Sequence, residues 1–98
     1  MIEVRRLIWD DWNVPHISRH DVTPDEVEAA CHAEPVLYRY SYKERLMLLG
    51  ETPTGRVLAI VIGPVPDEEA GTYYPFTARP ADRRERRDYN DLKGGHLT

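Results

Sequence analysis

Two apolar runs joined by a short turn constrain the fold of this 98-residue chain more than any other feature. The runs Arg45–Leu49 and Val57–Ile62 are apolar on both of their faces, as the central strands of a sheet are. Between them, Pro53-Thr54-Gly55 has the residue types of a tight turn. The pattern therefore predicts a β-hairpin at the centre of a sheet.

Other segments also have the character of strands. Leu7-Ile8-Trp9 predicts a short first strand, and the side chains of Val36–Tyr40 alternate between two faces. Thr72–Ala78 predicts the last strand, but Pro75 within it cannot donate a ladder hydrogen bond. We therefore expect this strand to lie at an edge or to carry a bulge at Pro75.

Two helices are predicted between the first strand and Val36. Asn13 is the expected N-cap of a short helix that ends near Arg19, because Pro15 is tolerated only in a first turn. The second helix has the clearest start in the chain. Thr23 fits its N-cap, Pro24 its first position and Glu26 the carboxylate of a capping box. This helix must end before Pro35.

The last predicted helix, Asp82–Tyr89, is rich in arginine and has no broad apolar face. Asp82 and Glu85 again fit a cap and a carboxylate at the third position. A helix this polar faces solvent or a partner. We predict an α+β fold in the order β-α-α-β-β-β-α, with helices packed on a small antiparallel sheet. We expect a single domain over residues 1–98, with residues 91–98 as a flexible tail.

Charge and cysteine content narrow the class of protein. The formal net charge is −4, whereas nucleic-acid binders are usually basic, so any RNA contact must rest on a local patch. Such a patch is present near the C-terminus, where arginines gather between Arg79 and Arg87. The single cysteine, Cys31, excludes an internal disulfide framework and a cysteine-based zinc site, and we expect it to be a small core residue. A cytoplasmic location is expected.

Several segments, taken in order, resemble the BrnT family of bacterial toxins over about residues 7 to 90. The family's His-Gly-Val is represented by His20-Asp21-Val22, so that Asp21 stands at the glycine position. The segments that carry the resemblance are Trp9-Asp10, Asn13, Arg19-His20-Asp21-Val22, Met47-Leu48-Leu49-Gly50, Gly55-Arg56-Val57-Leu58, Ala78-Arg79, Arg84-Glu85-Arg86-Arg87 and Tyr89.

The resemblance implies a RelE-like fold and a metal-independent endoribonuclease that arrests translation, so no cofactor is expected. It also implies a partner, a cognate antitoxin of the DNA-binding ribbon-helix-helix type. That antitoxin would neutralise the toxin, and the pair would bind DNA to repress its own operon.

Metal-free RNA cleavage needs a base for the 2′-hydroxyl proton, an acid for the leaving oxygen and cations for the charge that develops on phosphorus. Histidine suits the first two roles and arginine the third. The predicted catalytic residues are His20, Arg79 and Glu85, although Glu85 fits a helix cap better than a general base. The predicted RNA-binding residues are Arg19, Arg56, Arg83 and Arg86. His20 and Arg79 are expected to converge on one phosphate pocket.

Other interpretations remain open at this level. His20 also fits a surface histidine that closes a helix, and His16, four residues earlier, could join it in a weak metal site. The tyrosines could stack on unpaired bases, although aromatic residues on strands more often pack in the sheet; they are Tyr38, Tyr40, Tyr42, Tyr73 and Tyr74. The alternative function is a non-catalytic BrnT-like adaptor that grips a protein partner or nucleic acid through its C-terminal arginines. A metal-dependent hydrolase centred on the two histidines is the third possibility.

Overall fold

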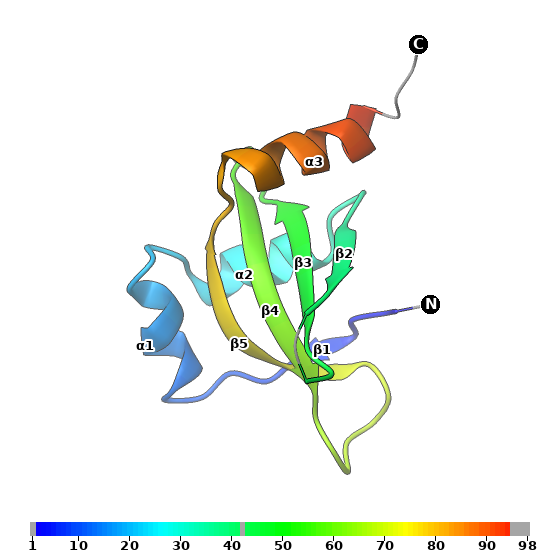
Figure 1. Ribbon diagram of the computed structural model, residues 1–98. Helices are drawn as coiled ribbons and strands as arrows, with labels where there is room; N and C mark the ends of the chain where they lie inside the picture. The colour runs from blue at the N-terminus through cyan, green and yellow to red at the C-terminus, as the bar shows by residue number, and fades with distance from the viewer. Residues whose placement is uncertain (1, 42, 95–98) are drawn as a thin grey trace.

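A five-stranded sheet with three helices forms the fold, which a computed structural model describes for residues 2–41 and 43–94 (Figure 1). The α+β class is confirmed. The elements in chain order are β1 (Arg6–Leu7), α1 (Asn13–Ser18), α2 (Pro24–Cys31), β2 (Leu37–Tyr40), β3 (Leu46–Glu51), β4 (Val57–Pro64), β5 (Thr72–Pro80) and α3 (Arg83–Gly94).

The strands lie in the order β1-β5-β4-β3-β2. Strands β2 to β5 pair antiparallel with their neighbours, whereas β1 pairs in parallel with β5. Two predictions need correction here. The sheet is mixed, because the chain passes through two helices before returning to it, and the order β-α-α-β-β-β-α is one strand short. All four segments after α2 that have strand character form strands.

The sheet is covered on both faces, as the apolar hairpin strands require. One face carries α1 and α2, which pack with alternate residues of β3, β4 and β5 such as Leu48, Ile60 and Ala78. The opposite face carries α3, whose Tyr89 packs with Leu49 and Ala59. Figure 1 shows α2 behind the sheet and α3 across one end of it, so that α3 covers only part of its face.

The start of α1 depends on two polar side chains from the Trp9-Asp10 and Asn13 signature. The Asp10 carboxylate accepts the backbone N–H of Trp12 at 2.9 Å and that of Asn13 at 3.0 Å. Asn13 is completely buried and is the first residue of α1, not its N-cap, so that prediction is wrong. Its Nδ2 donates to the carbonyl oxygens of Ile8 and Pro75, which joins α1 to β5.

The end of α1 explains why Asp21 occupies a glycine position. Asp21 has a φ of 60°, a left-handed conformation that Gly adopts freely and Asp tolerates better than most residues. The Asp21 N–H donates to the Ser18 carbonyl and the Val22 N–H to the Ile17 carbonyl. This is the Schellman arrangement, and its apolar pair, Ile17 and Val22, is buried in one cluster.

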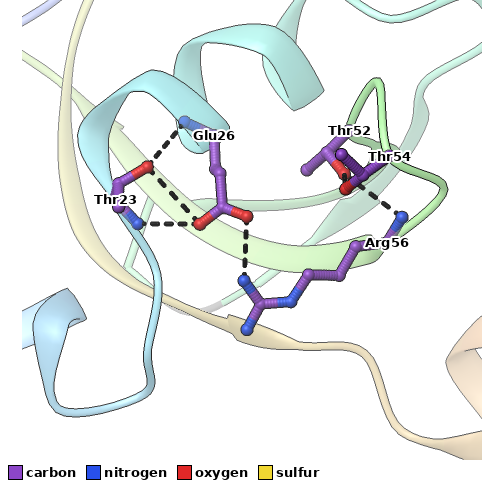
Figure 2. A network of polar contacts seen from close by, with 5 residues as sticks. All are labelled: Thr23, Glu26, Thr52, Thr54 and Arg56. Atoms are coloured by element: carbon purple, nitrogen blue, oxygen red, sulfur yellow. Dashed lines mark hydrogen bonds and ion pairs between the residues drawn. The ribbon is translucent and has the colours of Figure 1, made fainter.

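The predicted start of α2 is confirmed in detail. The Thr23 hydroxyl accepts the Glu26 backbone N–H at 3.2 Å, and the Glu26 carboxylate accepts the Thr23 backbone N–H at 3.0 Å (Figure 2). The same carboxylate also accepts a hydrogen bond from Arg56, the residue before β4, at 2.9 Å. Burial would raise the pKa of Glu26, but these donors outweigh it and hold the pKa below its ordinary value.

Pro75 lies where the sequence predicts an irregularity. The register between β4 and β5 shifts at this point, since Val61 pairs with Thr77 and Ile62 with Pro75. Phe76 is therefore the extra residue of a bulge, and β1 reaches only as far as Tyr73. The bulge leaves the Pro75 carbonyl to accept the Asn13 amide.

The capping box at the start of α3 is also confirmed, because Asp82 and Glu85 exchange hydrogen bonds of 2.8 Å with each other's backbone N–H groups. The helix continues past Tyr89 to Gly94, so residues 91–94 are helical and the predicted tail is wrong for them. Its remainder, 95–98, lies outside the described residues. Within the described residues, no helix is long and apolar enough to cross a membrane.

Gly50 supports a stability prediction. A Cβ at this position would lie 2.0 Å from the carbonyl oxygen of Ala30 in α2, and backbone atoms on both sides cannot yield cheaply. We expect Gly50→Ala to lower the free energy of unfolding by about 3 kcal/mol in urea denaturation. Gly94→Ala is the matched control, since a Cβ there meets nothing within 4 Å. Equal stabilities for the two variants would contradict the close contact between α2 and β3.

Candidate functional site

A cleft on the α3 face of the sheet is the candidate site. Thr77 of β5 pairs with Val61, which pairs with Met47, and Met47 packs in the cluster beneath α3. Thr77 therefore lies on the same face as α3, on the part that α3 leaves open. The cleft has a volume of about 510 Å³ and is lined by Trp12, His16, Arg45, Tyr74, Phe76 and Thr77.

Aromatic rings form two walls of this cleft. On α1, the Trp12 and His16 rings stack with their centroids 4.7 Å apart and their planes within 14°. On β5, Tyr74 and Phe76 meet edge to face at 5.1 Å. The Tyr74 hydroxyl donates to Asp10, and burial together with this carboxylate raises the Tyr74 pKa. Trp12 is 57% exposed, so its ring is available to a ligand.

Arg45 supplies the positive charge. Its guanidinium lies over the Phe76 ring, 3.8 Å from the centroid, in the geometry of a cation–π contact. The residue is half-buried, and no carboxylate within residues 2–41 and 43–94 pairs with it. Two arginines of the sheet are paired, Arg39 with Asp88 and Arg79 with Glu85, and Arg56, just before β4, is paired with Glu26.

His20 and Arg19 lie at the exposed end of α1. The His20 ring meets the His16 ring edge to face with 6.2 Å between centroids, so His20 adjoins the cleft through His16 but does not line it. Within the described part of the chain, no third His, Cys, Asp or Glu completes a group that could hold a metal ion with these histidines.

Arg79 is held by the start of α3. Its two terminal nitrogens donate to the two Glu85 carboxylate oxygens at 2.7 and 2.9 Å, while Glu85 also caps the helix through the Asp82 N–H. The Arg79 hydrogen bonds are the main reason that the Glu85 pKa lies below its ordinary value. Glu85 is buried with its oxygens occupied, which fits the cap role better than that of a general base.

The predicted site residues have different surroundings in the structure, and the convergence of His20 and Arg79 on one phosphate pocket stays a prediction. Arg79 lies on the same face as Thr77, two residues farther along β5, but neither it nor His20 lines the cleft. Arg56 lies beside α2 in the ion pair with Glu26 (Figure 2). Arg83 is exposed on the side of α3 away from the sheet, and Arg86 folds back to donate to the Ala81 carbonyl.

Sequence reasoning did not select Trp12, Arg45, Phe76 or Thr77 as site residues. A usable signal existed for Arg45, because it continues the alternation of Met47 and Leu49 and so shares their face. Phe76 could not be placed, since the bulge changes which face it occupies. Of the tyrosines, Tyr74 lines the cleft, Tyr38 and Tyr73 pack against the core, Tyr40 is 78% exposed and Tyr42 lies outside the described residues.

Cys31 has the structural role expected of it, and Tyr89 is also a packing residue. Tyr89 is buried beneath α3, and its hydroxyl donates to the Pro35 carbonyl at 2.8 Å. Cys31 is buried among apolar side chains, and this burial, with the nearby Glu28 charge, raises its pKa to about 12. The thiol is therefore not a nucleophile at neutral pH.

The fold class is α+β: a five-stranded sheet has α1 and α2 on one face and α3 on the other, and the cleft lies where α3 leaves its face open. No protein-family model matches this chain, and no curated protein sequence matches it significantly. Among solved structures, it is similar to the Brucella abortus ribonuclease toxin BrnT, with a TM-score of 0.61 and 20% sequence identity. The match covers 80% of this chain and 97% of that chain. The resemblance to BrnT is therefore confirmed in the fold.

The contact between Arg79 and Glu85 predicts a pH-dependent stability. Because the folded-state pKa of Glu85 lies below its ordinary value of 4.5, the stabilisation is complete above 4.5 and is lost as pH falls through the lowered pKa. We expect Glu85→Gln to lower the free energy of unfolding by about 2 kcal/mol at neutral pH, with a difference from wild type that shrinks in acid. Denaturant unfolding across this range is the measurement. Glu69→Gln, at an exposed loop position, is the control, and a pH-independent difference would contradict the assigned ion pair.

Proposed function

We propose that this protein is an endoribonuclease toxin that acts on single-stranded RNA at the cleft on the part of the sheet that α3 leaves open. One observation carries the proposal: a cleft with aromatic walls and an unpaired guanidinium, adjoined by imidazoles, on the fold of a ribonuclease toxin. Aromatic rings and cations are the groups with which proteins hold unpaired bases and phosphates.

The proposed reaction is metal-independent transesterification. The 2′-hydroxyl oxygen attacks the adjacent phosphorus while a base removes its proton, and the bond to the 5′-oxygen breaks as an acid protonates that oxygen. The products are a 2′,3′-cyclic phosphate and a 5′-hydroxyl, so no oxidant or further reactant is needed. We assign proton transfer to His20, with His16 as the neighbouring imidazole, and stabilisation of the phosphorane charge to Arg79. Glu85 acts as a positioning residue that holds Arg79.

The proposal also includes a protein partner that would hold the activity in check. An unchecked ribonuclease that arrests translation harms its own cell, so a cognate antitoxin in the same cytoplasm is expected, of the ribbon-helix-helix type that binds DNA. Arg19, at the end of α1, and Arg83 and Arg86, on α3, extend the positive surface that RNA or the antitoxin would meet. Arg56 contributes less, because Glu26 already neutralises it.

Purified protein tests the activity. We expect cleavage of single-stranded RNA in the presence of a metal chelator, with cyclic-phosphate ends. His20→Ala should lower kcat by about 10²- to 10⁴-fold, the contribution typical of a general acid or base. Arg79→Ala and the charge-conserving Arg79→Lys should both lose activity, because neither can reproduce the planar fork of arginine. Expression of the wild type alone should arrest growth.

The controls separate loss of chemistry from loss of folding. Arg87→Ala removes the same charge from an exposed position of α3 and should remain active. Each variant must keep the circular-dichroism spectrum and unfolding midpoint of a folded domain, because Arg79→Ala also weakens the start of α3. If folded His20→Ala and Arg79→Ala proteins cleave RNA as well as wild type does, the assigned residues are wrong.

A non-catalytic adaptor is the second candidate. Arg83 and Arg84 are exposed on α3 and have no ion-pair partner in the described part of the chain, which favours contact with an acidic partner or nucleic acid outside the cleft. The cleavage assay separates the two functions. An adaptor would leave RNA intact yet lose its partner when these arginines are replaced.

A further inference from the structure

The unequal pairing of the arginines on the α3 face points to a nucleotide-binding subsite. We infer that Arg45 holds a phosphate of the RNA while the aromatic walls of the cleft take the adjacent unpaired nucleobase. The inference rests on the proposed function, which it extends by naming the groups that recognise the substrate. Neither the sequence nor the likeness in fold assigns Arg45, Trp12 or Phe76 to such a role.

The arginines on the α3 face differ in whether a carboxylate balances their charge. Arg39 and Arg79 lie on the same face as Arg45, but Asp88 and Glu85 of α3 already balance their charges. Arg45 is half-buried, yet its partner is the Phe76 ring rather than a carboxylate. A partly desolvated guanidinium without an anion is the strongest local attraction for a phosphate, since its five donors match phosphate oxygens.

The shape of the cleft around Arg45 also fits a nucleotide. Trp12 and His16 form the wall on α1, and Tyr74 and Phe76 form the wall on β5. A space of about 510 Å³ suits one nucleotide rather than a duplex, and it lies within the range of small-molecule sites. Because each base has a flat face, stacking accepts any base but requires that it be unpaired.

A neighbouring hollow gives the RNA strand room to continue beyond the base. A second, smaller hollow shares the Arg45 and Phe76 pair with the cleft, and its other lining residues are Lys43, Glu44, Gly63 and Pro64. Gly63 leaves room for Phe76, since a Cβ at this position would lie 2.7 Å from the ring. Arg45 therefore lines both hollows, a position that suits a phosphate that links two nucleotides.

A binding experiment tests the subsite without relying on catalysis. The probe is a fluorescently labelled single-stranded 2′-deoxy trinucleotide, which lacks the attacking hydroxyl and so cannot be cleaved by the proposed reaction. Its affinity is measured by anisotropy at several salt concentrations, and Trp12 contact by quenching of tryptophan fluorescence. We expect Arg45→Ala to weaken binding about tenfold and to reduce the salt slope by about 1, as loss of one phosphate contact does.

Matched variants make the result specific. Phe76→Leu, which keeps apolar bulk without a ring face, should weaken binding about tenfold. Trp12→Phe should keep most of the affinity but lose the quenching, because Trp9 is held by its hydrogen bond to Glu28 at a different place. Arg87→Ala should change the affinity less than twofold, and a duplex of the same sequence should bind at least tenfold more weakly than the single strand.

The outcomes distinguish this inference from the proposed function. Binding that is insensitive to both Arg45→Ala and Phe76→Leu, or equal for duplex and single strand, overturns the subsite even if the protein cleaves RNA. Cleft-dependent binding without cleavage of the matching ribonucleotide retains the subsite and rejects the nuclease. Arg45-dependent binding of an acidic peptide but not of the trinucleotide would also overturn it, by making the cleft a protein-docking site.

Discussion

The buried side chain of Asn13 holds the arrangement on which the cleft depends. Its amide donates to Ile8 at the exit of β1 and to Pro75 in the bulge of β5, while its oxygen accepts the Asp10 backbone N–H. The bond to Pro75 joins residues that lie 62 positions apart in the sequence. An unsatisfied amide at a fully buried position would cost more than any one of these bonds contributes, so the loss of one of the three contacts would be strongly destabilising. They fix α1 beside β5, which is what places Trp12 and His16 opposite Phe76.

Ion pairing explains how a chain of net charge −4 can still offer a site for an anion. The acidic residues are not spread evenly over the surface, since α2 and α3 direct carboxylates toward the sheet, where they meet Arg56, Arg39 and Arg79. Each pair removes a positive charge from the surface potential. The positive patch that the sequence predicts near the C-terminus is therefore weaker than a count of arginines suggests, and the orientation of each guanidinium matters more than the total.

Sequence reasoning succeeded where the physical cause lies within a few residues. The Thr23 and Glu26 box, the Asp82 and Glu85 box and the irregularity at Pro75 all follow from local backbone chemistry. It failed where the partner is distant. Asn13 has the side chain of an N-cap, but its amide donates to a carbonyl of the distant strand β5. The sequence around Arg45 likewise does not indicate that its neighbour is a ring and not a carboxylate. The fold could be predicted without these two contacts, whereas the position of the site depends on both of them.

The different partners of Arg45 and Arg79 suit them to different parts of the proposed reaction. Glu85 takes two of the five Arg79 donors and the Pro80 carbonyl accepts a third, which fixes the plane of the group and leaves two donors beside a rigid helix cap. Its charge is already balanced, so it adds little to the attraction of RNA in the ground state. A prepositioned group of this kind is most effective where charge grows during the reaction, because no reorganisation is then needed. Arg45 has the opposite character: an unbalanced charge on a ring face attracts a phosphate strongly but fixes its direction less. In the proposed reaction, Arg45 would thus bind the RNA and Arg79 would stabilise the transition state. A single unpaired arginine could not perform both tasks equally well.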